Sequence, residues 1–297
     1  MNVGDALLDL ARADGLRSII VVGTGKNVGK TVVVRAIARS AGARGLAFGL
    51  TSIGRDGEAV DVTDAGVKPR LFLRPGAIVA TARDTLPRHP ASELLDLSNL
   101  RTAAGSLVYA RVKAAGYFEI AGPPTATGMR ACIEHLARLG CEQTIVDGAI
   151  DRVAALAGGG DAIVVATGAN NAKTMQEAVD DVRGLVARLR VEAFEPNETF
   201  VAIEGALTAE AAARLLAAGE RRQIVVRHPT QIVISGKAFL GIAHRLRIRC
   251  REPLRIVAAT VASIGRERYF EPRGFARAVA NATELPTFDV FAAERAA

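Results

Sequence analysis

The chain has 297 residues, a length that suits one large domain or two smaller ones with a sizeable core. Its composition is globular, with 49% hydrophobic residues, 23% charged residues and no Trp. The net charge of +7 raises the question of nucleic acid, but the basic residues are spread along the chain without aromatic clusters, so we expect no nucleic-acid partner.

Targeting and cysteine patterns indicate a cytoplasmic protein. Residues 1–18 carry acidic side chains and lack the basic start and long apolar centre of a secretion signal. No apolar run is long enough to cross a bilayer, so no membrane partner is expected. Cys132, Cys141 and Cys250 fit neither a disulfide framework nor a zinc pattern, and we expect buried, reduced thiols.

Short apolar runs rich in β-branched residues alternate with helical patterns along most of the chain. This alternation predicts an α/β fold in which helices flank a mostly parallel sheet. A helical period joins Met129, Ile133 and Leu136 and ends at Gly140, and another extends over residues 175–189. The predicted strands before residue 196 are 18–22, 47–52, 77–81, 117–120, 143–146 and 161–166.

A boundary is expected near Pro196, where the alternation pauses. Residues 1–195 would form a nucleotide-binding domain and residues 196–297 a C-terminal α/β lobe, which could also continue the first sheet. In this part, strands are expected at 200–203, 223–226 and 254–259, with helices from Thr208 and near Lys237.

The stretch GTGKNVGKT follows the first predicted strand and precedes a helix expected near Lys30. It is either a phosphate-binding loop or a glycine-rich turn with solvated lysines, because its first glycine stands one residue earlier than the usual spacing. The strand–loop–helix context favours phosphate binding, since loop amides and a helix N-terminus attract anions. Lys30 would neutralise the outer phosphates and Thr31 would bind Mg²⁺. The predicted nucleotide-binding residues are Gly23, Thr24, Gly25, Lys26, Asn27, Val28, Gly29, Lys30 and Thr31.

A phosphate-binding loop of this kind needs a carboxylate to hold Mg²⁺, usually at the end of a neighbouring strand. Asp147 ends the strand predicted at 143–146, and it is either a metal-linked acid or a turn-forming Asp-Gly. Asp56 and Glu58 follow the second predicted strand, where they could position Mg²⁺ or the attacking water, or form a solvated acidic turn with Asp61. The predicted catalytic residues are Lys30, Asp56 and Asp147, and the predicted metal ligands are Thr31, Asp147, Asp56 and Glu58.

Two further segments bear on the nucleotide. Thr167, Gly168 and Asn170 leave the strand predicted at 161–166 and are candidates to line the nucleotide or a partner. No N-K-x-D segment for reading guanine is present, so ATP is favoured over GTP. Asp151 and Arg152 are compatible with either a structural or a functional role.

The loop resembles the G-T-x-x-x-V-G-K-T loop of dethiobiotin synthetase and its relatives, in which the longer spacing is normal. "VDGA" at residues 146–149 is similar to the acidic segment of that group, with Asp in place of Glu. The resemblance implies a P-loop NTPase with a three-layer α/β/α fold that binds ATP and Mg²⁺.

Over most of its length the chain resembles the smaller ATPase subunit proposed to reactivate lysine 5,6-aminomutase and related cobalamin-dependent aminomutases. The segments that carry this resemblance are GTGKNVGKT, GLTSIGRDGEAVD, PGAIVATA, TIVDGAIDR, VVATGAN and RHPTQIVIS. It implies an ATP-driven accessory protein with a protein client, a larger ATPase partner or both. A homodimer is another possible assembly.

The alternative is an ATP-dependent ligase of the dethiobiotin synthetase type, acting on a small carboxylic acid or carbamate. Those enzymes carry a substrate lysine directly after the second strand, where this chain reads TSIGRDG. The Lys68-Pro69 pair comes later, after a long acidic loop. A scaffold protein with a degenerate site is a third hypothesis, disfavoured because Lys30, Thr31 and Asp147 are all present.

Overall fold

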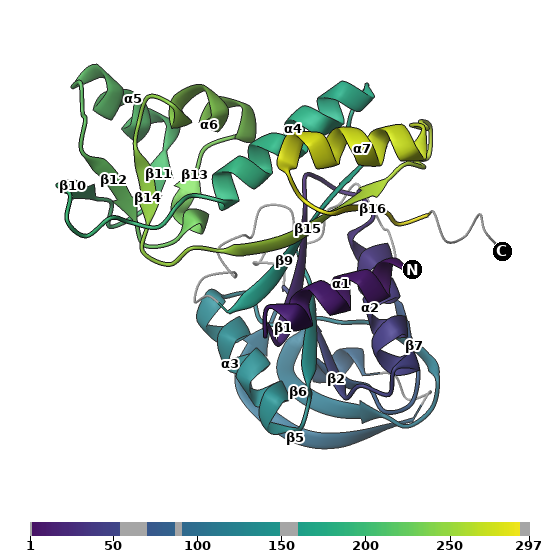
Figure 1. The fold of residues 1–297 in the computed structure, drawn as a ribbon. Coiled ribbons are helices and arrows are strands. Elements are labelled where there is room, and N and C mark those ends of the chain that lie inside the picture. The colour runs from purple at the N-terminus through teal and green to yellow at the C-terminus, as the bar shows by residue number, and fades with distance from the viewer. Residues whose placement is uncertain (1, 54–69, 87–90, 149–159, 292–297) are drawn as a thin grey trace. The chain divides into compact units, whose positions relative to one another are not determined.

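The structure is a computed structural model that describes residues 2–53, 70–86, 91–148 and 160–291 (Figure 1). The chain divides into two compact units. The first comprises Met1–Val22 and Lys30–Ala155, and the second comprises Gly23–Gly29 and Leu156–Ala297. The boundary expected near Pro196 therefore falls inside the second unit. Both units are α/β, and most of their strand pairs are parallel.

The first unit is built on a sheet whose strands run in the order β1-β8-β2-β4-β6-β5. Neighbours among β1, β8, β2 and β4 are parallel, as predicted. Almost every residue of these four strands is buried, as expected of parallel strands covered on both faces. Their bounds are β1 Ser18–Gly23, β8 Gln143–Asp147, β2 Phe48–Ser52 and β4 Ile78–Ala82.

One edge of this sheet differs from the prediction. Strands β5 (Ser92–Thr102) and β6 (Gly105–Val112) form an antiparallel hairpin on β4 that was not predicted from the sequence. The strand expected at 117–120 is also wrong in part: β7 covers only Gly116–Phe118 and pairs antiparallel with β3 (Leu71–Leu73) in a separate ribbon. The first unit is thus parallel in its centre and antiparallel at this edge.

The helices of the first unit are α1 (Val3–Ala13), α2 (Lys30–Ala43) and α3 (Ala126–Arg138), with a short 3-10 turn η1 at Arg83–Thr85. Helix α2 begins at Lys30, as expected from the loop motif. The predicted helical face of α3 is confirmed, because Met129, Ile133 and Leu136 are buried.

In the second unit, β9 (Asp161–Gly168), β15 (Arg255–Ala262) and β16 (Thr287–Asp289) pair in parallel. Helix α4 (Met175–Leu189) contacts β9, and α7 (Pro272–Thr283) contacts β15, β16 and α4 (Figure 1). The strand predicted at 161–166 and the helix predicted at 175–189 are confirmed.

The second unit also holds a smaller parallel sheet, β10-β12-β14. Its apolar core includes Leu207, Ile224 and Phe239. Residues after 196 thus form this small sheet and also supply β15 and β16, which lie beside β9. The elements of this region are β10 Phe200–Ala202, β11 Leu207–Thr208, α5 Ala209–Ala217, β12 Gln223–Val226, η3 Pro229–Gln231, β13 Ile232–Val233, α6 Gly236–Ala243 and β14 Ile248–Cys250.

The three cysteines are buried and unpaired, as predicted. Burial raises the pKa of Cys132 and Cys141 to about 12 and that of Cys250 to about 11, so each remains a neutral thiol near pH 7. Within the described ranges, no helix has both the length and the apolar character needed to span a membrane.

Candidate phosphate and metal site

The loop at residues 23–29 is held against the end of β9 in the second unit. The Thr24 amide donates to the carbonyl of Ala166 at 3.0 Å. The Thr24 hydroxyl donates to the Thr167 hydroxyl at 3.2 Å, and the side-chain amide of Asn171 donates to the Thr24 carbonyl at 3.4 Å. These contacts fix the start of the loop on the carboxyl end of a parallel strand, the usual ligand-binding edge of such sheets.

The loop backbone needs its small residues. Gly29 has a φ of 89°, a left-handed conformation that a side chain would strain. A Cβ on Gly25 would lie 1.5 Å from the Asn171 side-chain nitrogen, so a side chain here would require Asn171 to move. Asn27 has a φ of 57°, which Asn tolerates better than most residues, and its carbonyl accepts from Asn170 at 3.1 Å. The glycines thus serve a tight turn in close contact with the residues after β9.

Asp147 ends β8 at the carboxyl edge of the sheet in the first unit. Its backbone is in register with Val21 of β1 and Ser52 of β2, and its carbonyl accepts from the Ile53 amide at 2.9 Å. The next residue, Gly148, donates its amide to the Val21 carbonyl at 2.9 Å. A Cβ on Gly148 would lie 2.2 Å from that carbonyl oxygen, so the chain turns away at a position that only glycine fits.

The side chain of Asp147 meets the start of helix α2. The Thr31 hydroxyl donates to the Asp147 carboxylate at 3.3 Å. Burial raises the pKa of Asp147 from 3.8 to about 6, although the positive charge of Lys30, the Thr31 hydrogen bond and the charge of Arg35 each act to lower it. The carboxylate is therefore poorly solvated, and an additional cation beside it would be favourable.

The described part of this site fits a magnesium ion chemically. Mg²⁺ prefers hard oxygen ligands and is often held by one or two protein oxygens together with substrate phosphates. Thr31 and Asp147 present a hydroxyl and a carboxylate in contact with each other. Within the described ranges, no group of three or more His, Cys, Asp or Glu side chains is arranged to hold a metal by itself.

Several predicted residues lie outside the described residues. Asp56, Glu58 and Asp61 fall in the segment 54–69, and Asp151 and Arg152 fall in 149–159. Among the described candidates, Thr31 is hydrogen-bonded to Asp147 in the first unit, and Thr24 is hydrogen-bonded to Thr167 in the second.

Two residues of the site were not predicted from the sequence. Arg35 lies on α2, one turn after Thr31, and its charge acts on Asp147. The helical spacing of four residues between Thr31 and Arg35 is a signal that could have identified it. Asn171 binds the loop carbonyl of Thr24, but nothing in its local sequence distinguishes it from the neighbouring Asn170.

Comparisons with known proteins add no relative. Neither the protein-family models, nor the curated proteins, nor the solved structures contain a match to this chain.

Proposed function

We propose that this chain is a P-loop ATPase that binds Mg-ATP. The observation that carries the proposal is the hydrogen bond from Thr31 to Asp147, in which the hydroxyl after the loop lysine meets a desolvated carboxylate at a strand end. A strand, a glycine-bearing loop and a helix that begins at Lys30 supply the local context that phosphate binding requires. The α/β architecture is compatible with the three-layer class of P-loop proteins.

The loop and the residues around it have distinct roles in this proposal. The loop amides would surround the phosphates, and the Lys30 ammonium would neutralise the negative charge of the outer phosphates. Thr31 and Asp147 would hold Mg²⁺, which supplies charge stabilisation for phosphoryl transfer when bound. Asp56 and Glu58 remain candidates for positioning the metal or the attacking water.

We further propose that the protein is an accessory factor that reactivates a cobalamin-dependent aminomutase. The supporting observation is the order of the resembling segments, from GTGKNVGKT to RHPTQIVIS. In this function ATP binding or hydrolysis shifts a two-state equilibrium, and a difference in affinity for the client between the two states drives exchange of its damaged cofactor. A larger ATPase would be the natural partner.

Equilibrium binding of Mg-ATP tests the nucleotide site. We expect the wild-type protein to bind and Lys30→Ala to lose at least about tenfold in affinity, because a charge-assisted contact to phosphate is removed. Lys113→Ala is the matched control: Lys113 lies just after β6, 3.5 Å from Glu93, and its loss should leave binding unchanged. Undiminished ATP affinity in a folded Lys30→Ala protein would refute the site.

Hydrolysis assays separate the accessory factor from a ligase. ATP turnover is measured alone, with a panel of small carboxylic acids, and with a purified cobalamin-dependent aminomutase. Stimulation by the aminomutase supports the proposal. Turnover that depends on one acid, with formation of its ligated product, would replace it with the ligase function.

A further inference from the structure

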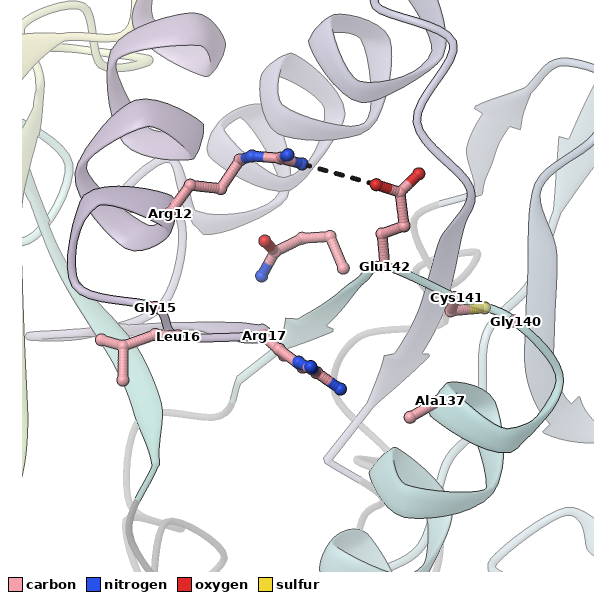
Figure 2. A pocket seen from close by; sticks show the side chains of 9 residues that line it. Arg12, Gly15, Leu16, Arg17, Ala137, Gly140, Cys141 and Glu142 are labelled. Carbon is pink, nitrogen blue, oxygen red and sulfur yellow. Dashed lines mark ion pairs between the residues drawn. The ribbon is translucent and has the colours of Figure 1, made fainter.

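The first unit contains a pocket of about 410 Å³ at the amino ends of β1 and β8 (Figure 2). It is lined by the end of α1, the turn into β1, and the turn between α3 and β8. Gln143, which begins β8, lines it, whereas Asp147 ends the same strand. The strand rise places the two residues about 13 Å apart, so this pocket is distinct from the candidate metal site.

The pocket wall contains a buried hydrogen-bond donor without a partner. Gln143 is 1% exposed, and its side-chain nitrogen makes no hydrogen bond to any described residue. Leaving a buried donor unsatisfied costs about 1–3 kcal/mol. A ligand that accepts a hydrogen bond from this nitrogen would recover that energy.

The charges around the pocket favour an anion. Arg12 is paired with Glu142 at 3.9 Å, and both side chains are about half exposed, so the pair is loose (Figure 2). Arg17 is exposed, and its backbone carbonyl accepts from the Thr144 amide at 2.8 Å, whereas its guanidinium makes no hydrogen bond or ion pair with a described residue. The pocket lining therefore contains two guanidinium groups and one carboxylate, which gives it an excess of positive charge and of N–H donors.

We propose that this pocket binds a small molecule bearing a carboxylate or phosphate group. Arg17 and the Gln143 side-chain amide donate to the oxyanion, and Arg12 contributes positive charge at the rim. The volume lies within the range of small-molecule sites. The proposal does not depend on the ATPase function.

Titration with two anions, sodium phosphate and sodium succinate, tests the pocket. The readout is the Gln143 side-chain amide signal in a ¹H–¹⁵N spectrum, which is assigned as the signal that disappears in Gln143→Met. We expect a saturable shift of this signal with at least one anion, and the anion that produces it identifies phosphate or carboxylate chemistry. Because the readout is local, anion binding at the phosphate loop does not interfere.

Matched variants decide whether the proposed residues hold the anion. Arg17→Ala should weaken the binding seen at the Gln143 signal about tenfold or more, since it removes a charge-assisted contact. Arg39→Ala removes an exposed guanidinium from α2, away from the pocket, and should leave the affinity unchanged. Gln143→Met removes an unsatisfied donor, so its thermal midpoint without anion should not fall. No saturable shift with either anion, or equal affinity in wild type and Arg17→Ala, would overturn the proposal.

Discussion

Asp147 connects stability with the proposed metal binding. Burial disfavours its ionised form and raises its pKa to about 6, while Lys30, Thr31 and Arg35 compensate only in part. Groups that must bind a cation are often desolvated at a cost to the folded protein. The energy lost in the ligand-free protein would be recovered when a metal neutralises the carboxylate.

This balance predicts that the difference in stability between Asp147→Asn and the wild-type protein depends on pH. A carboxyl whose folded pKa lies above its unfolded value loses stability as the pH rises, because the unfolded chain releases its proton first. The loss develops between about pH 4 and pH 6 and reaches at most about 3 kcal/mol. Without ligand, Asp147→Asn should therefore unfold at a higher temperature than wild type at pH 7.5 and at a similar temperature near pH 4.

Thermal unfolding between pH 4 and pH 8, followed by circular dichroism, measures this difference. Glu134→Gln, on the exposed face of α3, is the control and should keep the wild-type pH profile. A lower unfolding temperature for Asp147→Asn at pH 7.5 would show that the ionised carboxylate stabilises the ligand-free fold, contrary to the argument.

Site residues could be predicted from the sequence where a suitable side chain stands at a characteristic position in a motif. Thr31 and Asp147 are recognisable because one follows the loop lysine and the other ends an apolar strand before a glycine. Their contact was not predictable from spacing, because it depends on β1 and β8 being neighbours in the sheet. Asn171 could not be found, since its role depends on where the loop folds against β9.

At the scale of elements, helices α4 and α6 meet through two glycines. A Cβ on Gly184 of α4 would lie 2.6 Å from the backbone carbon of Gly236, the first residue of α6. A Cβ on Gly236 would lie 2.8 Å from the backbone of Gly184. The helix backbones are in contact here, so a methyl group requires one helix to move.

We expect Gly184→Ala to destabilise the second unit. The helix propensity of Ala favours the substitution by up to about 1 kcal/mol, but displacing a packed backbone costs about 1–3 kcal/mol. Gly241→Ala in α6 is the control, because nothing lies within 4 Å of its added Cβ, and it should be neutral or stabilising. Urea unfolding of the two variants measures the difference, and a Gly184→Ala protein as stable as Gly241→Ala would contradict the close packing.

The elements found from sequence are those with a continuous apolar pattern. Strands β1, β8 and β9 are buried along their length and were predicted within a few residues. Strand β5 was missed because all of its residues are exposed or partly exposed, including Leu94 and Leu97, so neither a buried run nor a clean alternation marks it. Strand β5 pairs with β6, which in turn pairs with β4, and the local sequence of β5 does not reveal these partners.

At the scale of the whole molecule, part of the positive charge is compensated by carboxylates close to the arginines. Many arginines are paired with nearby carboxylates in both units, which lowers the charge available to an external polyanion. The pairs include Arg44–Asp5 at 3.0 Å, Arg227–Glu252 at 2.8 Å and Arg249–Glu192 at 2.9 Å. A net charge of +7 therefore does not by itself predict a nucleic-acid site.

This pairing predicts that any binding to DNA is weak and sensitive to salt. Contacts between arginines and phosphates release counterions, so any affinity should fall steeply between about 50 and 200 mM salt and should not depend on sequence. Fluorescence anisotropy with two labelled duplexes of different sequence measures both properties. Polyglutamate is the control competitor, since it displaces a partner held by charge alone. Binding that persists at 200 mM salt, resists polyglutamate and distinguishes the duplexes would instead require arginines gathered on one face to read the DNA.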